Sequence, residues 1–108
     1  MARVVVLPEV YEALHELVKV LYQNGYFGFE DSAIAYVDAI YDFMYSIPQQ
    51  PKRLTIETHL GQYYCRFSPN KHTSYYILFD LENDIYLIRH LFNNHGPEYP
   101  KFIPPRDR

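Results

Sequence analysis

The sequence predicts an α+β domain in which a helical hairpin packs on one face of an antiparallel sheet. Three observations predict it. Residues 8–46 carry apolar side chains at helical spacing, residues 62–92 hold three short aromatic-rich runs, and the helical part comes first. The chain has 108 residues, of which 48% are hydrophobic, and this is enough for one modest core. We therefore expect residues 1–108 to form a single domain.

The first predicted elements are a short strand and a helix. Residues 2–7 form a run rich in β-branched side chains, which is typical of a strand. Pro8 suits the first turn of a helix, and Asn24-Gly25 is a helix stop. The apolar spacing between them predicts a helix over Pro8–Gln23.

A second helix follows a short aromatic link, Tyr26–Phe29. Asp31 and Ser32 are candidate N-caps for it. Pro48 disfavours helical geometry in the residue before it, so the helix should end near Ile47. Two helices of about sixteen residues with a short link form an αα-hairpin.

The second half of the chain predicts a meander of three or four strands. Three runs at 62–67, 74–79 and 85–92 are separated by turns, and strands this close in sequence pair antiparallel. Residues 52–60 alternate in polarity and are either a fourth strand or an ordered loop. The tail from about residue 93 to 108 is rich in proline and is predicted to be irregular.

Charge and cysteine content limit the functional classes. The net charge of −3 divides into 2 − 7 = −5 over residues 1–46 and 8 − 6 = +2 over residues 47–108. The lone Cys65 excludes an internal disulfide and a cysteine-based zinc site. The sequence holds no metal-binding motif, no phosphate-binding glycine loop and no apolar run of membrane-spanning length. We expect a cytoplasmic protein without cofactor or metal and without membrane contact.

Two tyrosine doublets, Tyr63-Tyr64 and Tyr75-Tyr76, lie in adjacent predicted strands. One member of each must face each side of the sheet. We expect one ring to fill the core and the other to lie on an exposed face. There the rings could stack on bases while Arg66, Lys71 and His72 neutralise phosphate. The alternative is that tyrosine, a good strand former, only covers the sheet.

A second candidate site is a polar cluster in the tail, formed by His90, Asn93, Asn94, His95, Glu98, Tyr99 and Lys101. Histidine and tyrosine could act as acid or base in phosphodiester cleavage. Arg66 or Lys101 could stabilise the charge of the phosphorane. The alternative is an ordinary polar loop.

Four stretches of the sequence carry a family resemblance. They are Val4–Glu9, Ala35–Ile40 followed by Ser46-Ile47-Pro48, the aromatic strand Tyr75–Phe79 that leads into Ile85–Leu91, and Asn94–Pro100. In order and spacing they resemble the RelE/ParE toxin superfamily of bacterial type II toxin–antitoxin systems. The resemblance spans residues 3–101 and implies a compact α+β fold and an antitoxin that wraps the toxin.

Carried over residue by residue, the basic positions of the first meander strand fall at Tyr64 and Arg66. The tail positions fall at His95 and Tyr99. The sequence departs from the family at Tyr76, where RelE-type members carry arginine. A phenol cannot make the bidentate phosphate contact of a guanidinium, so this phosphate contact is missing. The predicted catalytic residues are Arg66, His95 and Tyr99, and the predicted RNA-binding residues are Tyr64, Lys71, His72, Tyr76 and Lys101.

The sequence is consistent with three functions. The first is a toxin that cleaves mRNA on the ribosome without a metal, by attack of a ribose 2′-OH on the adjacent phosphate. The second is a ParE-like inhibitor of DNA gyrase without catalytic residues. The third is a non-toxic interaction module on the same fold. The expected partners are a cognate antitoxin with ribosome and mRNA or gyrase, and a homodimer is left open.

Overall fold

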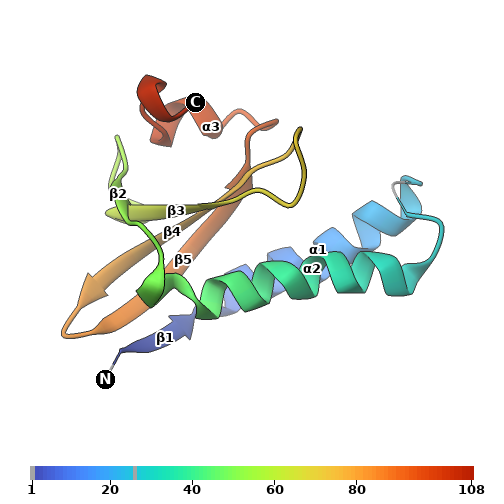
Figure 1. The fold of residues 1–108 in the computed structure, drawn as a ribbon, viewed down its shortest axis with the longest axis horizontal. Helices are drawn as coiled ribbons and strands as arrows, with labels where there is room; N and C mark the ends of the chain where they lie inside the picture. The colour runs from blue at the N-terminus through green and yellow to red at the C-terminus, as the bar shows by residue number, and fades with distance from the viewer. Residues whose placement is uncertain (1, 26) are drawn as a thin grey trace.

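The chain forms a five-stranded mixed sheet with a helical hairpin on one face and the C-terminal segment on the other (Figure 1). The computed structural model describes residues 2–25 and 27–108. In chain order the elements are β1 (Arg3–Val6), α1 (Pro8–Gln23), α2 (Glu30–Tyr45), the 3₁₀ turn η1 (Ile47–Gln49), β2 (Arg53–Leu54), β3 (Tyr63–Phe67), β4 (Tyr75–Glu82), β5 (Ile85–Asn93), α3 (Tyr99–Phe102) and η2 (Pro105–Asp107). The α+β class is therefore confirmed.

The two long helices agree closely with the sequence pattern. Helix α1 has the predicted bounds, and Gly25 follows it with a φ of 75°. Helix α2 begins earlier than expected, because Phe29 is its N-cap. The prediction of Asp31 or Ser32 as the cap is wrong, since both lie within the first helical turn. The link between the helices is described only from Phe27, because Tyr26 lies outside the described residues.

The strands lie where the sequence predicts them, but the sequence pattern did not predict how β1 pairs. The sheet order is β1-β5-β4-β3-β2, and β1 pairs with β5 in parallel while the other pairs are antiparallel. Asn83 and Asp84 join β4 to β5 with φ of 52° and 63°. Positive φ at both central residues is the geometry of a tight hairpin turn. Residues 52–60 are mostly loop, since only Arg53–Leu54 pair with β3.

A glycine explains how the loop before β3 approaches the sheet. Gly61 has a φ of 142°, and a Cβ there would lie 2.8 Å from the backbone nitrogen of Phe79. The Thr55 hydroxyl donates to the Gly61 carbonyl at 2.7 Å and holds the loop in place. Glycine is therefore required at this position for both its conformation and its size.

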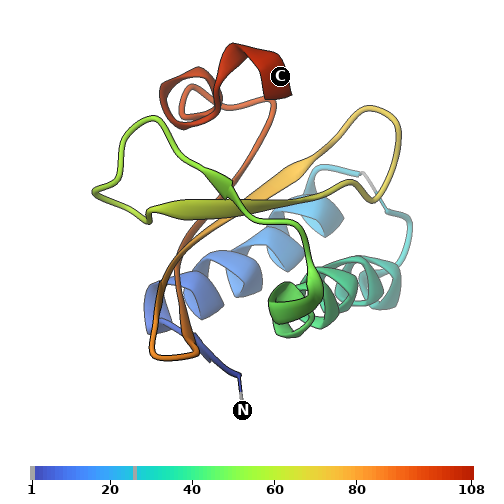
Figure 2. The ribbon, with the colours of Figure 1, turned by 60° about the vertical axis from the view of Figure 1, so that its left-hand side comes forward.

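Each face of the sheet has its own apolar core. On the hairpin side, helix residues such as Leu14, Ile40 and Met44 pack with Ile77, Phe79 and Ile88 of the sheet. On the opposite side, Phe102 and Ile103 of the C-terminal segment cover Tyr64, Tyr76, Leu78 and Phe92. Figure 2 shows the sheet lying between these two layers. The tail is thus ordered and partly helical, so the prediction of an irregular tail is wrong.

This second core also corrects the prediction of an exposed aromatic face. One tyrosine of each doublet points away from the hairpin, as the alternation predicts, but these two, Tyr64 and Tyr76, are each only 1% exposed. Burying an aromatic side chain contributes about 1.5–3 kcal/mol, and the proline-rich tail supplies the covering side chains. No helix in the described ranges is long and apolar enough to cross a membrane.

Candidate functional site

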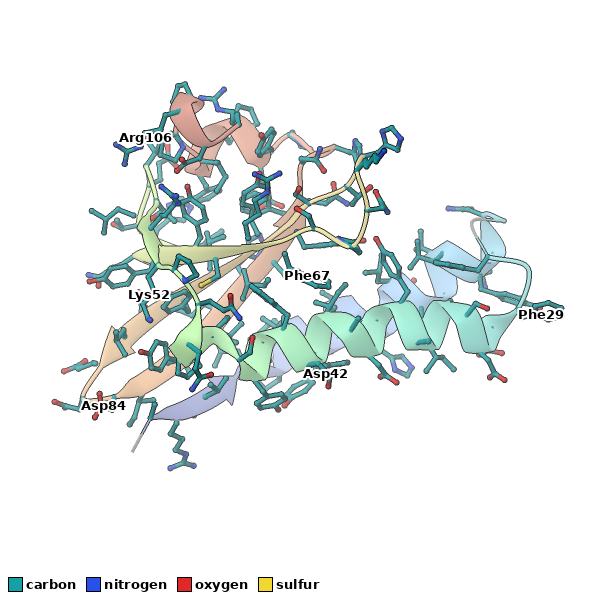
Figure 3. The ribbon with its side chains drawn as sticks, viewed as in Figure 1. Phe29, Asp42, Lys52, Phe67, Asp84 and Arg106 are labelled. Carbon is teal, nitrogen blue, oxygen red and sulfur yellow. The ribbon has the colours of Figure 1, made fainter. Side chains whose placement is uncertain are left out.

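A pocket of about 350 Å³ lies at the edge of β3, beyond the point where the short strand β2 stops. Its polar lining comes from β2, β3, β4 and the C-terminal segment, together with Gln50. We call it the arginine pocket and define it by Arg53, Tyr64, Arg66, Tyr76, Arg106, Asp107 and Arg108. Figure 3 shows Arg106 at the end of the molecule away from the helical hairpin.

The charge of this pocket is opposite to that of the whole chain. Four arginines and one aspartate line it, which gives 4 − 1 = +3, whereas the chain carries −3. Within the described part of the chain, Arg66, Arg106 and Arg108 form no ion pair with a carboxylate. A concave site with this concentration of one charge attracts anions.

Arg66 is held by hydroxyl groups instead of a carboxylate. Its Nε donates to Ser68 Oγ and to Ser74 Oγ, both at 3.2 Å. The backbone nitrogen of Ser74 donates in turn to Asn94 Oδ1 at 2.9 Å. These neutral partners orient the guanidinium and leave its full charge available for an anion.

Two buried tyrosines form the floor of the pocket. The hydroxyl of Tyr64 donates to a carboxylate oxygen of Asp107. Burial raises the pKa of Tyr64, and the bond to Asp107 raises it further. Burial, then hydrogen bonding to Tyr99, raises the pKa of Tyr76 to about 12. Both phenols are therefore neutral at pH 7 and can donate hydrogen bonds or a proton, but cannot act as bases.

The three predicted catalytic residues do not line one pocket. Arg66 lines the arginine pocket and pairs with Tyr76 across the strands. The ring of Tyr99 also contacts that tyrosine, with centroids 5.3 Å apart, but Tyr99 does not line the pocket. His95 instead contacts Thr73, with 3.1 Å between Nε2 and Oγ1, and lines a different pocket. The structure thus brings Arg66 and Tyr99 around Tyr76 and places His95 elsewhere.

The second pocket, of about 670 Å³, lies between the hairpin and the turn that joins β3 to β4. We call it the apolar pocket. Its walls are mainly apolar and aromatic, and its polar residues include two histidines: Leu17, Val20, Leu21, Phe27, Tyr36, Asn70, His72, Thr73, Tyr75, Asn93 and His95. Of the predicted RNA-binding residues, His72 is therefore here, while Lys71 and Lys101 are exposed and line neither pocket.

His90 and Cys65 have structural contacts. In the tail cluster, His90 Nε2 and Glu98 Oε2 lie 2.5 Å apart, so this pair ties β5 to the segment before α3. Cys65 is 2% exposed, and burial raises its pKa to about 11. Cys65 is therefore a small core residue, since a buried thiol with a raised pKa is a poor nucleophile.

Sequence reasoning missed four residues of the arginine pocket: Arg53, Arg106, Asp107 and Arg108. Their one visible signal was charge, because Arg106–Arg108 is a dense charged run and Arg53 lies in the basic stretch that begins at Lys52. Nothing local indicates that these two segments meet.

Comparisons with family models, with curated proteins and with solved structures give no match for this chain. Within residues 2–25 and 27–108, no group of three or more histidine, cysteine, aspartate or glutamate side chains is placed to hold a metal ion.

Proposed function

We propose that this protein is a RelE/ParE-like toxin that inhibits growth by metal-independent cleavage of mRNA on the ribosome, and that a cognate antitoxin neutralises it. The observation that carries the proposal is the arginine pocket, a concave site with a net charge of 4 − 1 = +3. A pocket of this charge suits the phosphates of a nucleic acid, which dominate the affinity of most nucleic-acid complexes.

The order of elements supports the same proposal. A first strand, an αα-hairpin and an antiparallel meander follow one another, as the resemblance to the RelE/ParE superfamily implies. The arginine pocket also contains Arg66, the one basic residue that the resemblance assigned to the first meander strand. Residue-level resemblance and pocket geometry therefore point to the same strand.

In the proposed reaction the ribose 2′-OH gives its proton to solvent water and attacks the adjacent phosphorus, and the bond to the 5′ oxygen breaks. The products are a 2′,3′-cyclic phosphate and a free 5′-OH. Arg66 stabilises the added negative charge on the phosphorane as an oriented cation. In this proposal Tyr99, whose ring centroid lies 5.3 Å from that of Tyr76, gives a proton to the leaving oxygen.

The test is ribosome profiling during pulsed expression, with Arg66→Ala as the matched inactive variant. We expect new mRNA ends in the ribosomal A site for the wild type and about 100-fold fewer for the variant. Unchanged ends in the wild type would remove the nuclease proposal. Harmless expression in a strain without antitoxin would instead favour a non-toxic interaction module.

One observation favours an alternative, a ParE-like inhibitor of DNA gyrase. Tyr76 is uncharged and buried at the position where the resemblance calls for a phosphate-binding arginine. A supercoiling assay with purified gyrase separates the two: inhibition by both wild type and Arg66→Ala supports gyrase as the target, and no inhibition by either removes it.

A further inference from the structure

Asp107 is the one acidic side chain among the described residues that line the arginine pocket. One of its oxygens accepts a hydrogen bond from the Tyr64 hydroxyl, and the other lies 3.5 Å from Nη1 of Arg53. Its side chain is 15% exposed, whereas that of Arg53 is 57% exposed. The carboxylate therefore sits within the pocket against a cation and a phenol, which is the position that a phosphate oxygen would take.

Buried side chains anchor the segment that carries Asp107 on its N-terminal side, and after Asp107 the Nε of the exposed Arg108 donates to the Ile103 carbonyl at 2.9 Å. Phe102 and Ile103 are buried against the sheet and fix the chain up to that point. Beyond them Pro105–Asp107 form a single 3₁₀ turn, in which the Asp107 amide donates to the Pro104 carbonyl at 3.0 Å. The neighbours Arg106 and Arg108 are both exposed. Asp107 can therefore leave the pocket while the second core stays intact.

We propose that Arg53 and Tyr64 form a phosphate seat, and that Asp107 fills this seat in the free protein as an internal competitor of the ligand. The identity of the ligand as an RNA phosphate rests on the proposed function, whereas the seat itself rests on the contacts of Asp107. When a phosphate enters, the carboxylate is displaced. Arg53 and Tyr64 then bind the phosphate oxygens in its place, because a phosphate accepts the same charge-assisted hydrogen bonds.

The charge at Asp107 sets the size of the effect. Its carboxylate neutralises one of four positive charges and repels an incoming anion at a separation of a few ångströms. Removing a unit charge at that distance changes the affinity for an anion by about tenfold at a hydrated site and moderate salt. An Asn side chain has the same shape and can still accept from Tyr64, so Asp107→Asn removes the charge with little other change.

The experiment titrates inorganic pyrophosphate, followed by calorimetry, into three proteins. These are the wild type, Asp107→Asn and Asp42→Asn, whose carboxylate is exposed on α2 and lies far from Arg106 (Figure 3). The control makes the same change in net charge. We expect about tenfold tighter binding for Asp107→Asn and less than twofold change for Asp42→Asn. Equal or weaker binding by Asp107→Asn overturns the proposal, as does an equal gain in both variants.

The double variant locates the seat. In the Asp107→Asn background, Arg53→Gln should weaken pyrophosphate binding about tenfold. In the wild-type background the same substitution should weaken binding less, because Arg53 is already paired with Asp107. An Arg53→Gln effect that is the same in both backgrounds overturns the competition between Asp107 and the ligand. Asp107→Ala provides a second variant in case the Asn side chain forms a new contact, and it must change the affinity in the same direction.

A parallel titration with a short single-stranded RNA separates this proposal from the proposed function. Tighter pyrophosphate binding by Asp107→Asn, with no RNA binding and no mRNA cleavage, supports the seat and removes the nuclease. mRNA cleavage by the wild type together with unchanged pyrophosphate affinity in Asp107→Asn supports the nuclease and removes the competitor role.

Discussion

The two faces of the sheet are covered by different kinds of structure. The hairpin face is covered by two helices of 16 residues each, whose buried side chains recur at helical spacing. The other face is covered by the short segment that contains α3 and η2, where Phe102 and Ile103 are the buried residues. The sequence therefore shows the helical layer as apolar residues at helical spacing. It shows the C-terminal layer only as two apolar side chains among prolines. The two pockets differ in the same way. The C-terminal segment of the second layer lines the arginine pocket, whereas the helical hairpin lines the apolar pocket.

The largest expected effects test whether the two layers are equally important for stability. Leu14→Ala on the hairpin side and Phe102→Ala on the tail side each remove a buried side chain and should lower the free energy of unfolding by about 3–4 kcal/mol. Denaturation in urea measures both. If Phe102→Ala costs less than about 1 kcal/mol while Leu14→Ala keeps its full cost, then the tail is only loosely attached and the second core contributes little.

The next prediction compares the two pockets through activity. Under the proposed function, Arg66→Ala should lower the rate of mRNA cleavage about 100-fold, because the arginine stabilises charge in the transition state. His95→Ala should lower it less than tenfold, because His95 lines the apolar pocket. A primer-extension assay of cleaved mRNA on ribosomes measures both rates. Equal losses would mean that the apolar pocket belongs to the active site and that His95 carries a proton, as the sequence predicted.

A third prediction concerns the loop that borders the sheet edge. Gly61→Ala places a Cβ 2.8 Å from the backbone nitrogen of Phe79 at a φ of 142°. The clash with backbone atoms and the strained conformation should cost about 2–3 kcal/mol of unfolding free energy. Gly28→Ala is the matched control, because a Cβ there meets nothing within 4 Å. Equal thermal stability of the two variants would show that the loop moves away from β4 without cost.

The smallest expected effect is a loss of stability at alkaline pH. Burial raises the pKa of Tyr76 to about 12 from an ordinary value of 10.0. For an acid with a raised pKa, the folded state favours the protonated form, so the stabilisation is complete below pH 10 and is lost as the pH rises toward 12. The loss should be up to about 2 kcal/mol, and Tyr76→Phe should reduce it. Unfolding free energies measured across this pH range check the slope, and a slope identical in wild type and Tyr76→Phe contradicts the assignment.

Some of the candidate site could be predicted from the sequence. The alternation of the doublets correctly predicts that one tyrosine of each pair lies on the face opposite the hairpin, and these are Tyr64 and Tyr76. Arg66 was predicted from its strand and lines the pocket. The burial of the two tyrosines could not be predicted, because the residues that cover them come more than twenty positions later in a segment with no periodic pattern. The contacts of Asp107 with Arg53 and Tyr64 could not be predicted either, because these residues lie far apart in the sequence.

The sequence by itself determined the local structure: the bounds of α1, the place of α2, the three meander strands and the division of charge between the halves of the chain. These follow from spacing, turn residues and composition, which act over a few positions. The tertiary structure alone decided the parallel pairing of β1 with β5, the second core and the arginine pocket. The physical reason is that these features depend on burial between segments far apart in the chain. Phe102 and Ile103 are buried against the sheet, and the charged C-terminal run that follows them lines the arginine pocket beside β3.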